Sequence, residues 1–349
     1  MAYTNIDDPS AYFQTLLYTG DSNSPRDLVN DGNSDLQPDF VWIKGRSHAD
    51  LHLLYDSSRG GGKFLRSEST AAENTGGYGL TAFNSDGFRT NAYAYSNENT
   101  HTYAAWQWKA NGGTTSSNTD GSLTSTVQAN TTAGFSIVTY SNPSTNDNTI
   151  GHGLGVQPEI IIFKNTVDAS NWYVASKYLS NYTTKYLELD TTDAEQTHAD
   201  GMNSTAPTSS VFSVGGISRT GDSGNLAVAY CFASIQGFSK CASYVGNGNV
   251  DGVFVYLGFK PAFVMVKAIT SSKNWDISTG AVSSNQIDER LRANLADAEE
   301  SSGYIDFLSN GFKMRNTNGT QNSSGVSYIY MAFAENPFVT STGIPTTAR

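Results

Sequence analysis

Short apolar runs alternate with polar, turn-rich stretches along this chain, and two hydrophobic patterns recur among the runs. The first is an unbroken apolar run behind a proline, as in "PEIIIFK" (158–164), and its β-branched residues predict a buried strand. The second alternates apolar and polar positions, as in "KYLELD" (185–190), which is typical of a strand with one exposed face. About six such segments in roughly 100 residues, joined by polar turns, predict an antiparallel two-sheet sandwich.

The same succession of segments occurs three times. The proline-led run is found as "PDFVWIK", "PEIIIFK" and "PAFVMVK", which begin at Pro38, Pro158 and Pro261. Each copy then closes on an apolar run, at 103–110, 227–234 and 328–335. Ordered blocks at nearly equal spacings indicate internal repeats. We expect the three prolines to begin equivalent strands.

An eleven-residue stretch lies inside each copy and aligns without a gap. It reads "KFLRSESTAAE" (63–73), "KYLELDTTDAE" (185–195) and "ERLRANLADAE" (289–299), and we call it the recurring stretch. Its last residue is Glu73, Glu195 or Glu299. Because an acid at one position in every copy serves each unit in the same way, whereas a catalytic pair must converge on one cleft, we expect these glutamates to be structural.

The third recurring stretch leaves two interpretations open. The segment "IDERLRANLADAEE" (287–300) has the propensity of a helix. Its two counterparts, however, are typical of a strand followed by a turn. The repeat favours a strand and a short helical turn here, and a true helix is the alternative.

We therefore predict an all-β chain of three tandem antiparallel β-sandwich repeats, jelly-roll or lectin-like, of about 100 residues each. A polar, glycine-containing stretch between the first two copies predicts a linker. The expected boundaries are an N-terminal arm at 1–10, repeats at 11–112, 133–235 and 236–338, a polar linker at 113–132, and a C-terminal tail at 339–349.

Composition narrows the classes of partner. Aromatic residues make up 12% of the chain and need a core to bury them, so the chain is not of the disordered class. The net charge is −11 and no cluster of Lys and Arg occurs, which argues against a nucleic-acid partner. No apolar run approaches the length that spans a membrane. Cys231 and Cys241 are expected to be buried thiols, with a disulfide across a hairpin as the alternative.

Motifs that could carry catalysis are weak. The segment "GDSGN" (221–225) is similar to a serine-protease motif, but the matching loops of the other copies differ from it. His48 and His52 are four residues apart, yet the glutamate of the zinc-protease motif is missing after the first histidine. We therefore predict no catalytic residues, no metal site, no cofactor and no enzymatic activity.

Two tryptophans are the binding candidates. Trp172 and Trp275 recur at one position, each directly after a polar loop of variable sequence. An exposed aromatic face can pack against a sugar ring, although burial in the core is the alternative for both residues. We expect a binding surface on the loops 45–50, 165–171 and 268–274, with Trp172, Trp275 and the preceding Asn171 and Asn274 as its residues.

The ordered blocks also resemble a known family. Segments such as "PEIIIFKN", "NWYVASKYL", "KYLELDTTDAE" and "GFSKCASYVGNGN" are similar to virion proteins of marine tailed bacteriophages, the cyanophage-like and pelagiphage-like viruses, over about residues 11 to 338. The resemblance implies a virion structural protein that is made in the host cytoplasm and released by lysis. Other virion proteins are the implied partners.

Within that class, we expect a tail fibre or appendage that contributes to recognition of a host-surface glycan. Phage appendages are commonly trimeric, so we expect a homo-oligomer and specifically a trimer. A capsid decoration or spike protein is one alternative. A glycan depolymerase is another.

Overall fold

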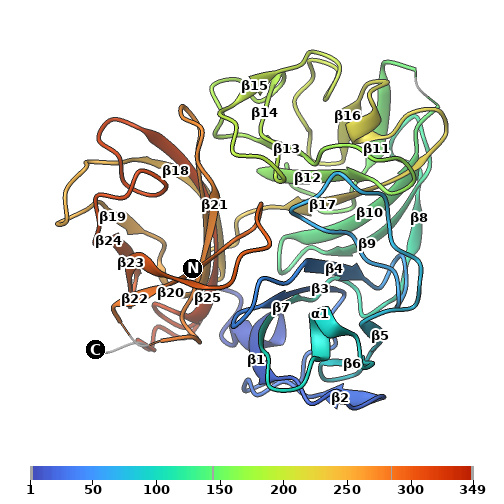
Figure 1. Ribbon diagram of the computed structural model, residues 1–349. Helices are drawn as coiled ribbons and strands as arrows, with labels where there is room; N and C mark the ends of the chain where they lie inside the picture. The colour runs from blue at the N-terminus through green and yellow to red at the C-terminus, as the bar shows by residue number, and fades with distance from the viewer. Residues whose placement is uncertain (1–2, 144, 284, 347–349) are drawn as a thin grey trace.

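The computed structural model of the chain describes residues 3–143, 145–283 and 285–346, and it is built almost entirely of antiparallel strands (Figure 1). Helical turns among these residues are limited to η1 (Pro9–Ala11), α1 (Ala94–Asn97) and η2 (Ser218–Thr220). The predicted all-β class is therefore confirmed. We call residues 11–112 the first unit, 113–235 the second unit and 236–338 the third unit.

Each unit contains four strands in the same spatial order. In the first unit they are β1 (Phe13–Thr19), β7 (Thr102–Trp108), β3 (Phe40–Gly45) and β4 (His52–Asp56). In the second they are β10 (Phe135–Ser141), β17 (Leu226–Phe232), β12 (Ile160–Asn165) and β13 (Tyr173–Ser176). In the third they are β18 (Ser239–Val245), β25 (Ser327–Pro337), β20 (Phe259–Ala268) and β21 (Trp275–Thr279).

The register of these sheets matches from unit to unit. Trp108, Phe232 and Phe333 pair on one side with Phe13, Phe135 and Ser239, and on the other with Phe40, Ile160 and Phe263. The prolines behave less uniformly than expected. Pro38 and Pro158 lie two residues ahead of their strands, whereas Pro261 lies inside β20 at an irregularity in its pairing with β25.

A second layer of short strands covers the outer face of the first two sheets. In the first unit it consists of β2 (Arg26–Leu28), β6 (Phe88–Thr90) and β5 (Leu80–Phe83). In the second it consists of β11 (Asn148–Gly151) with β16 (Val211–Val214), and β14 (Lys185–Tyr186) with β15 (Gln196–Thr197). Separate clusters of buried apolar side chains fill the space between the two layers in each unit.

The third unit differs from this plan. Its β21 continues through β22 (Ile287–Arg292), β23 (Glu300–Leu308), β24 (Gly311–Met314) and β19 (Phe254–Tyr256) into one eight-stranded sheet. The Lys240 ammonium on β18 donates to the Tyr256 carbonyl on β19, at 2.8 Å, so the two outer strands of this sheet approach each other. The helix alternative for the third recurring stretch is wrong, because burial of Ile287 and Leu291 in a strand outweighs its helix propensity.

The predicted linker at 113–132 is also wrong. It forms β8 (Ser116–Asn118) and β9 (Ser125–Asn130), and β9 pairs with β10 as a further strand of the second sheet. The side-chain amide of Gln128 on β9 donates to the hydroxyls of Ser57 and Ser58 in the first unit. A polar composition indicated flexibility, but backbone pairing and the buried Val127 fix this segment in place.

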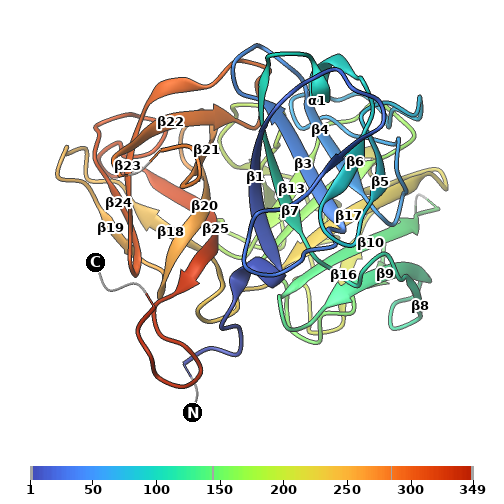
Figure 2. The ribbon, with the colours of Figure 1, turned by 90° about the horizontal axis from the view of Figure 1, so that it is seen from below.

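Residues 3–10 of the arm and 339–346 of the tail lie against the third unit and against each other (Figure 2). The Thr4 hydroxyl donates to the Gln236 carbonyl, and Ile6 is buried. The Ser341 backbone N–H and hydroxyl both donate to the Asp7 carboxylate. Cys231 and Cys241 are buried free thiols, so the disulfide alternative is wrong.

The main core lies where the three units meet. The rings of Trp108, Phe232 and Phe333 form a triangle with centroid separations of 6.5, 5.5 and 6.0 Å. Apolar residues of the proline-led runs and of the closing runs are buried here, as expected for buried strands: Phe40, Ile43, Trp108, Ile160, Ile162, Phe232, Phe263, Val264 and Phe333. Beside the triangle a cavity of about 10 Å³ has only apolar walls. A space so small and apolar stays dry and holds no ligand.

Candidate functional site

The three junctions between units use the same contacts, all made by the recurring stretch. Its eighth residue accepts a hydrogen bond from a lysine of the neighbouring unit: Lys44 donates to the Ala296 carbonyl, Lys164 to Thr70 and Lys267 to Thr192, at 3.1, 2.8 and 2.9 Å. Its eleventh residue, Glu299, Glu73 or Glu195, donates its backbone N–H to Arg46, Thr166 or Ile269. Each contact joins one unit to the next, so the stretch is repeated because the chain has three such junctions.

The contacts close a ring. The second unit contacts the first, the third contacts the second, and the first contacts the third through Lys44 and Ala296. The three units are therefore arranged around one centre (Figure 1).

Trp172 and Trp275 belong to these junctions and not to an exposed surface. Their side chains are 0% and 2% exposed. Each indole N–H donates to the fourth residue of a neighbouring recurring stretch: Trp172 to the Arg66 carbonyl at 2.8 Å, and Trp275 to the Glu188 carbonyl at 2.9 Å. The expectation of sugar-binding tryptophans is corrected, because the polar end of each ring bonds backbone of the next unit and its face is covered.

Replacing either tryptophan by Phe tests this role. Trp172→Phe and Trp275→Phe keep a buried ring but remove the indole donor. The Glu188 carbonyl then loses its Trp275 hydrogen bond, whereas the Arg66 carbonyl keeps the Ser69 backbone N–H at 3.3 Å. An unsatisfied buried carbonyl costs about 1–3 kcal/mol. We expect Trp275→Phe to lower the free energy of unfolding by that amount in urea denaturation, and Trp172→Phe to lower it by less. A loss below about 0.5 kcal/mol in both variants would contradict the junction role of the indole N–H.

Asn171 and Asn274 support the tryptophans from the side. The Asn171 amide donates to the Asp190 carboxylate at 3.0 Å, and Asp190 also accepts the Trp172 backbone N–H. Asn274 stands in the same place: its side-chain oxygen accepts from the Asn294 amide, and the Asn294 side-chain oxygen accepts the Trp275 backbone N–H. Both asparagines are half-buried positioning residues. The tips of the loops 45–50, 165–171 and 268–274 are exposed, at 47–49, 167–169, 270 and 272.

The three repeated glutamates differ in what their carboxylates bind. Glu73 pairs with the buried Arg59 at 2.7 Å, and Glu299 pairs with Arg46 across the junction of the first and third units at 2.8 Å. Glu195 accepts from the backbone N–H and hydroxyl of Ser180. What the three share is a backbone N–H that donates to a carbonyl of the neighbouring unit, so the position has a structural role.

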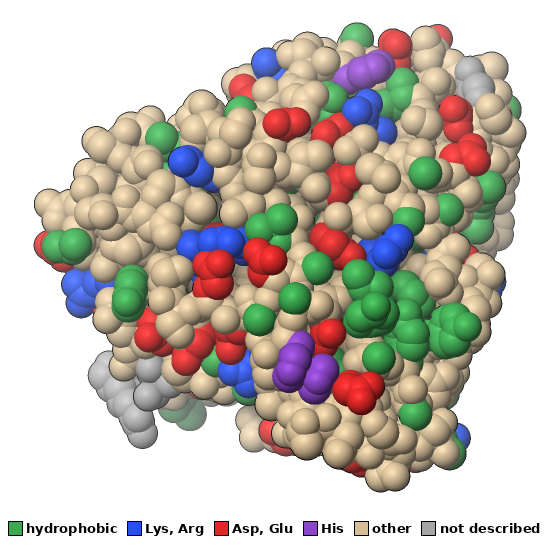
Figure 3. Space-filling model, viewed as in Figure 1, with side chains coloured by type: hydrophobic (Ala, Val, Ile, Leu, Met, Phe, Trp, Pro, Cys, Tyr) green, Lys and Arg blue, Asp and Glu red, His purple; other side chains and the backbone are tan. Residues whose placement is uncertain are grey.

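A group of three tyrosines on the first unit, one exposed and two half-buried, is the best candidate for a ligand-binding surface. Tyr78 is 48% exposed, and its ring stacks on Tyr93 with centroids 5.0 Å apart and planes 19° apart. Tyr95 packs edge-on against Tyr93 at 5.3 Å. We call Tyr78, Tyr93 and Tyr95 the tyrosine patch. Figure 3 shows hydrophobic side chains gathered over the part of the first unit that holds α1 and β5.

The backbone holds the tyrosine patch in its shape. Gly76 lies so close to the Tyr78 ring that a Cβ there would be 2.3 Å from the ring, so a larger residue would displace the ring. The Tyr78 carbonyl accepts from the Tyr55 hydroxyl at 3.1 Å. A fixed aromatic surface binds a ligand without losing side-chain freedom. Sequence reasoning considered only tryptophans and missed this patch, although "NAYAY" (91–95) alternates aromatic and small residues.

Comparison with known proteins places the whole arrangement in one family. The model of a domain of unknown function, DUF7483, matches residues 8–337, which is most of the chain. The chain belongs to the DUF7483 family. No curated protein and no solved structure matches this chain.

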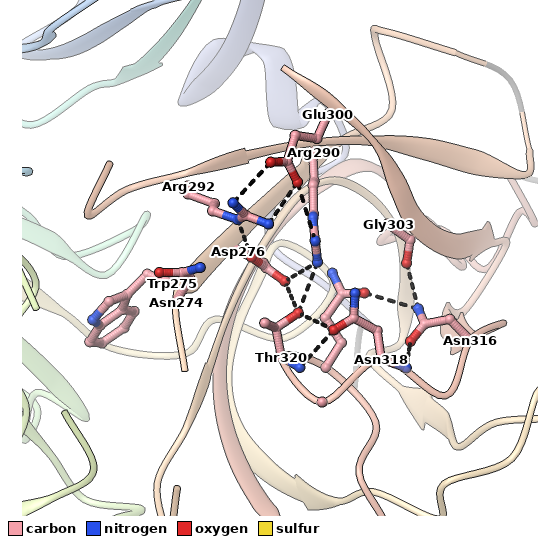
Figure 4. A network of polar contacts seen from close by, with 12 residues as sticks. Asn274, Trp275, Asp276, Arg290, Arg292, Glu300, Gly303, Asn316, Asn318 and Thr320 are labelled. Carbon is pink, nitrogen blue, oxygen red and sulfur yellow. Dashed lines mark hydrogen bonds and ion pairs between the residues drawn. The ribbon is translucent and has the colours of Figure 1, made fainter. Parts of the chain in front are cut away.

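The third unit of this DUF7483 chain holds a buried charged cluster (Figure 4). Asp276 accepts from Arg290 at 2.9 Å and from the Thr320 hydroxyl, and burial raises the pKa of its carboxyl. Arg292 pairs with Glu300 at 2.6 Å. Each acid faces an arginine, so the cluster is a set of neutralised ion pairs that holds β21, β22 and β23 together.

His52 and the three junction lysines of this DUF7483 chain are buried in the fold. His48, at an exposed loop tip, stacks on His101 with ring centroids 3.5 Å apart. Among residues 3–143, 145–283 and 285–346, no three His, Cys, Asp or Glu side chains gather as metal ligands. None of the helices in those ranges is long and apolar enough to cross a membrane. Burial lowers the pKa of the junction residue Lys267 to about 7.

Proposed function

We propose that this chain is a structural protein of a bacteriophage particle, a tail-fibre or appendage component that contributes to recognition of a host-surface glycan. The similarity of its ordered blocks to virion proteins of marine tailed phages supports the placement in a virion. The tyrosine patch supports the recognition role, and it is the observation that carries the proposal.

The chemistry of the tyrosine patch suits a sugar. A pyranose ring presents C–H groups on one face and hydroxyls around its edge. The face of Tyr78 can pack against the C–H groups, and phenol hydroxyls can donate to or accept from the sugar hydroxyls. Tyrosine offers this amphipathic surface at low cost in side-chain entropy.

Assembly gives such a site its strength. One small aromatic patch binds a single sugar weakly, whereas several copies on one particle act together and raise apparent affinity by about 10²–10⁴-fold. We propose a homotrimer that attaches to other virion proteins and acts by binding, without an enzymatic step. The rivals to this function, a capsid decoration or spike protein and a glycan depolymerase, are outcomes of the experiment below.

The test compares Tyr78→Ala with a matched variant, Tyr304→Ala. Tyr304 is 40% exposed but lies in the third unit, on β23. Loss of one stacking contact is worth about 0.5–1.5 kcal/mol, so we expect Tyr78→Ala to weaken binding to extracted host polysaccharide by about 2- to 12-fold. Tyr304→Ala should bind as the unmodified protein does.

Two further readouts separate the rival functions. Saturable release of reducing ends from the polysaccharide would favour a depolymerase. Antibody labelling of particles for electron microscopy locates the protein, and labelled heads with unlabelled tails would favour the decoration or spike role. Equal binding by Tyr78→Ala and Tyr304→Ala would remove the tyrosine patch from the proposal.

A further inference from the structure

The outer edge of strand β1 has no strand beside it among the described residues. The first sheet runs β1-β7-β3-β4, so β1 pairs with β7 on one edge only. Bonds at both ends of this pair fix which groups face outward: the Gly20 N–H donates to the His101 carbonyl, and the Lys109 N–H donates to the Tyr12 carbonyl. Bonding alternates along an antiparallel strand. The N–H and C=O groups of Phe13, Thr15 and Leu17 therefore point away from β7.

The equivalent edges of the other two units are covered. By register, Phe135 and Ile137 of β10 are equivalent to Phe13 and Thr15 of β1. In the second unit, β9 covers this edge: Asn130 pairs with Phe135, and Gln128 pairs with Ile137. In the third unit the chain just before β18 turns back along it. Ile235 and Ser239 exchange backbone hydrogen bonds, and the Ser234 hydroxyl accepts the Cys241 N–H.

The first unit does not repeat this device. The chain just before β1 forms η1, and farther back its arm packs on the third unit, where the Thr4 hydroxyl donates to the Gln236 carbonyl. In the two other units, the segment ahead of the first strand covers that strand's outer edge. In the first unit the described part of that segment goes elsewhere.

A groove of about 540 Å³ lies along this edge, between the first and third units. Phe13, Gln14 and Thr15 form one side of it. The opposite wall is made of small uncharged residues, which are Ala262, Gly280, Ala281, Val282 and Ser283. This wall leaves room for a main chain and presents no charge of its own. Charged residues line the groove elsewhere: Asp31 is exposed, and Lys260 and Glu335 neutralise each other in an ion pair at 2.8 Å.

We infer that this groove binds an extended, uncharged peptide segment of a second protein, which pairs antiparallel with β1 as β9 pairs with β10. Strand addition is a general mode of peptide recognition, in which backbone hydrogen bonds supply the affinity. Phe13 and Thr15 offer two N–H and two C=O groups to such a segment. The edge is recessed between two units, so an extended segment fits it better than the flat edge of another folded copy.

The chain itself supplies a suitable peptide for the test. The octapeptide TSTVQANT, residues 124–131, contains β9 and carries no charged side chain. In the second unit Gln128 lies opposite Ile137, so in the peptide the Gln128 N–H should face the Thr15 carbonyl, whereas the Val127 N–H should point away. Fluorescence anisotropy of the labelled peptide with the full chain should show saturable binding.

Two methylated peptides make the experiment specific. Methylation of the Gln128 backbone nitrogen removes a bonding N–H and places a bulky methyl against β1, so it should weaken binding at least about tenfold. Methylation of the Val127 backbone nitrogen, which points away from β1, should change binding less than about threefold. These peptides leave the protein unchanged.

A protein variant completes the test. Thr15→Pro removes an outward N–H, and proline is tolerated on an edge strand whose N–H faces away from its partner. It should abolish peptide binding, while Thr15→Val should keep it. Absence of binding at millimolar peptide, or equal binding of both methylated peptides, would overturn the inference. Self-association of the protein that Thr15→Pro abolishes would also overturn it, because a second copy would then be the occupant.

Discussion

Replacing Phe333 by Ala is expected to lower the free energy of unfolding by about 3–5 kcal/mol, the usual cost of removing a buried aromatic ring. The Phe333 ring lies 5.1 Å from Phe13 of the first unit, 6.0 Å from Phe232 of the second and 6.1 Å from Phe263 of the third. Its loss removes contacts with all three units at once. Chemical denaturation followed by tryptophan fluorescence measures the effect.

Phe254→Ala is the matched control for this prediction. Phe254 lies on β19 of the same unit, but its side chain is 44% exposed. Surface substitutions of this kind change stability by about 0.5 kcal/mol or less. If Phe333→Ala also cost less than about 1 kcal/mol, the meeting point of the units would not be the centre of stability. Trp108→Ala, at the equivalent position, should behave as Phe333→Ala does.

The second large effect is expected on acidification, through His52. His52 occupies the place that Trp172 and Trp275 hold in the other units, and it contacts backbone across the junction of the first and third units. Its Nδ1 accepts the Trp42 indole N–H at 2.8 Å. Its Nε2 lies 2.9 and 3.1 Å from the carbonyls of Arg292 and Leu295, so Nε2 carries the proton of a neutral ring.

The sign of the effect follows from this arrangement. Burial, together with the nearby Lys44 ammonium, lowers the pKa of His52 to about 3 from an ordinary value of about 6.5. Unfolding therefore takes up a proton between these two pH values, and stability falls as pH falls through that window. At 1.36 kcal/mol per pH unit, the full loss is roughly 5 kcal/mol. Above about pH 6.5 this residue adds no dependence on pH.

The comparison of interest is between the unmodified protein and His52→Gln. Glutamine stays neutral and keeps one acceptor and one donor, while all other titrating groups are shared by the two proteins. The free energy of unfolding, measured from pH 7 to pH 4, should fall more steeply in the unmodified protein. Parallel curves would show that His52 is not the group that takes up the proton.

Because the sequence repeats, much of the fold could be predicted from it. Apolar runs behind Pro38 and Pro158 predicted buried strands, because a run of β-branched residues that short fits a strand buried on both faces. Alignment of three copies also favoured a strand over a helix at the start of 287–300, where propensity alone favoured a helix, and the structure has a strand at Ile287–Arg292. Helix propensity is a weak preference at 287–300, whereas the two other copies show that this position of the repeat is packed as a strand.

The candidate site was less predictable. Trp172 and Trp275 were singled out correctly as a recurring pair, but the sequence does not say whether a recurring aromatic residue faces solvent or a neighbouring unit. That depends on the ring closing, which brings Arg66 and Glu188 from distant parts of the chain beneath the indoles. The tyrosine patch was missed because its three rings come from two segments that only the fold brings together.

By itself, the sequence determined that this protein is all-β, that one succession of strands occurs three times, and which apolar runs supply the core. These properties depend on hydrophobic periodicity and on comparison of one copy with another, both of which are local. Tertiary structure alone decided that residues 113–132 form β8 and β9, that the third sheet continues to eight strands, and that the outer edge of β1 is left uncovered. The physical reason is that backbone pairing depends on which groups meet in space. The segments ahead of the first strand of each unit have different neighbours in the ring of units, so each takes a different path.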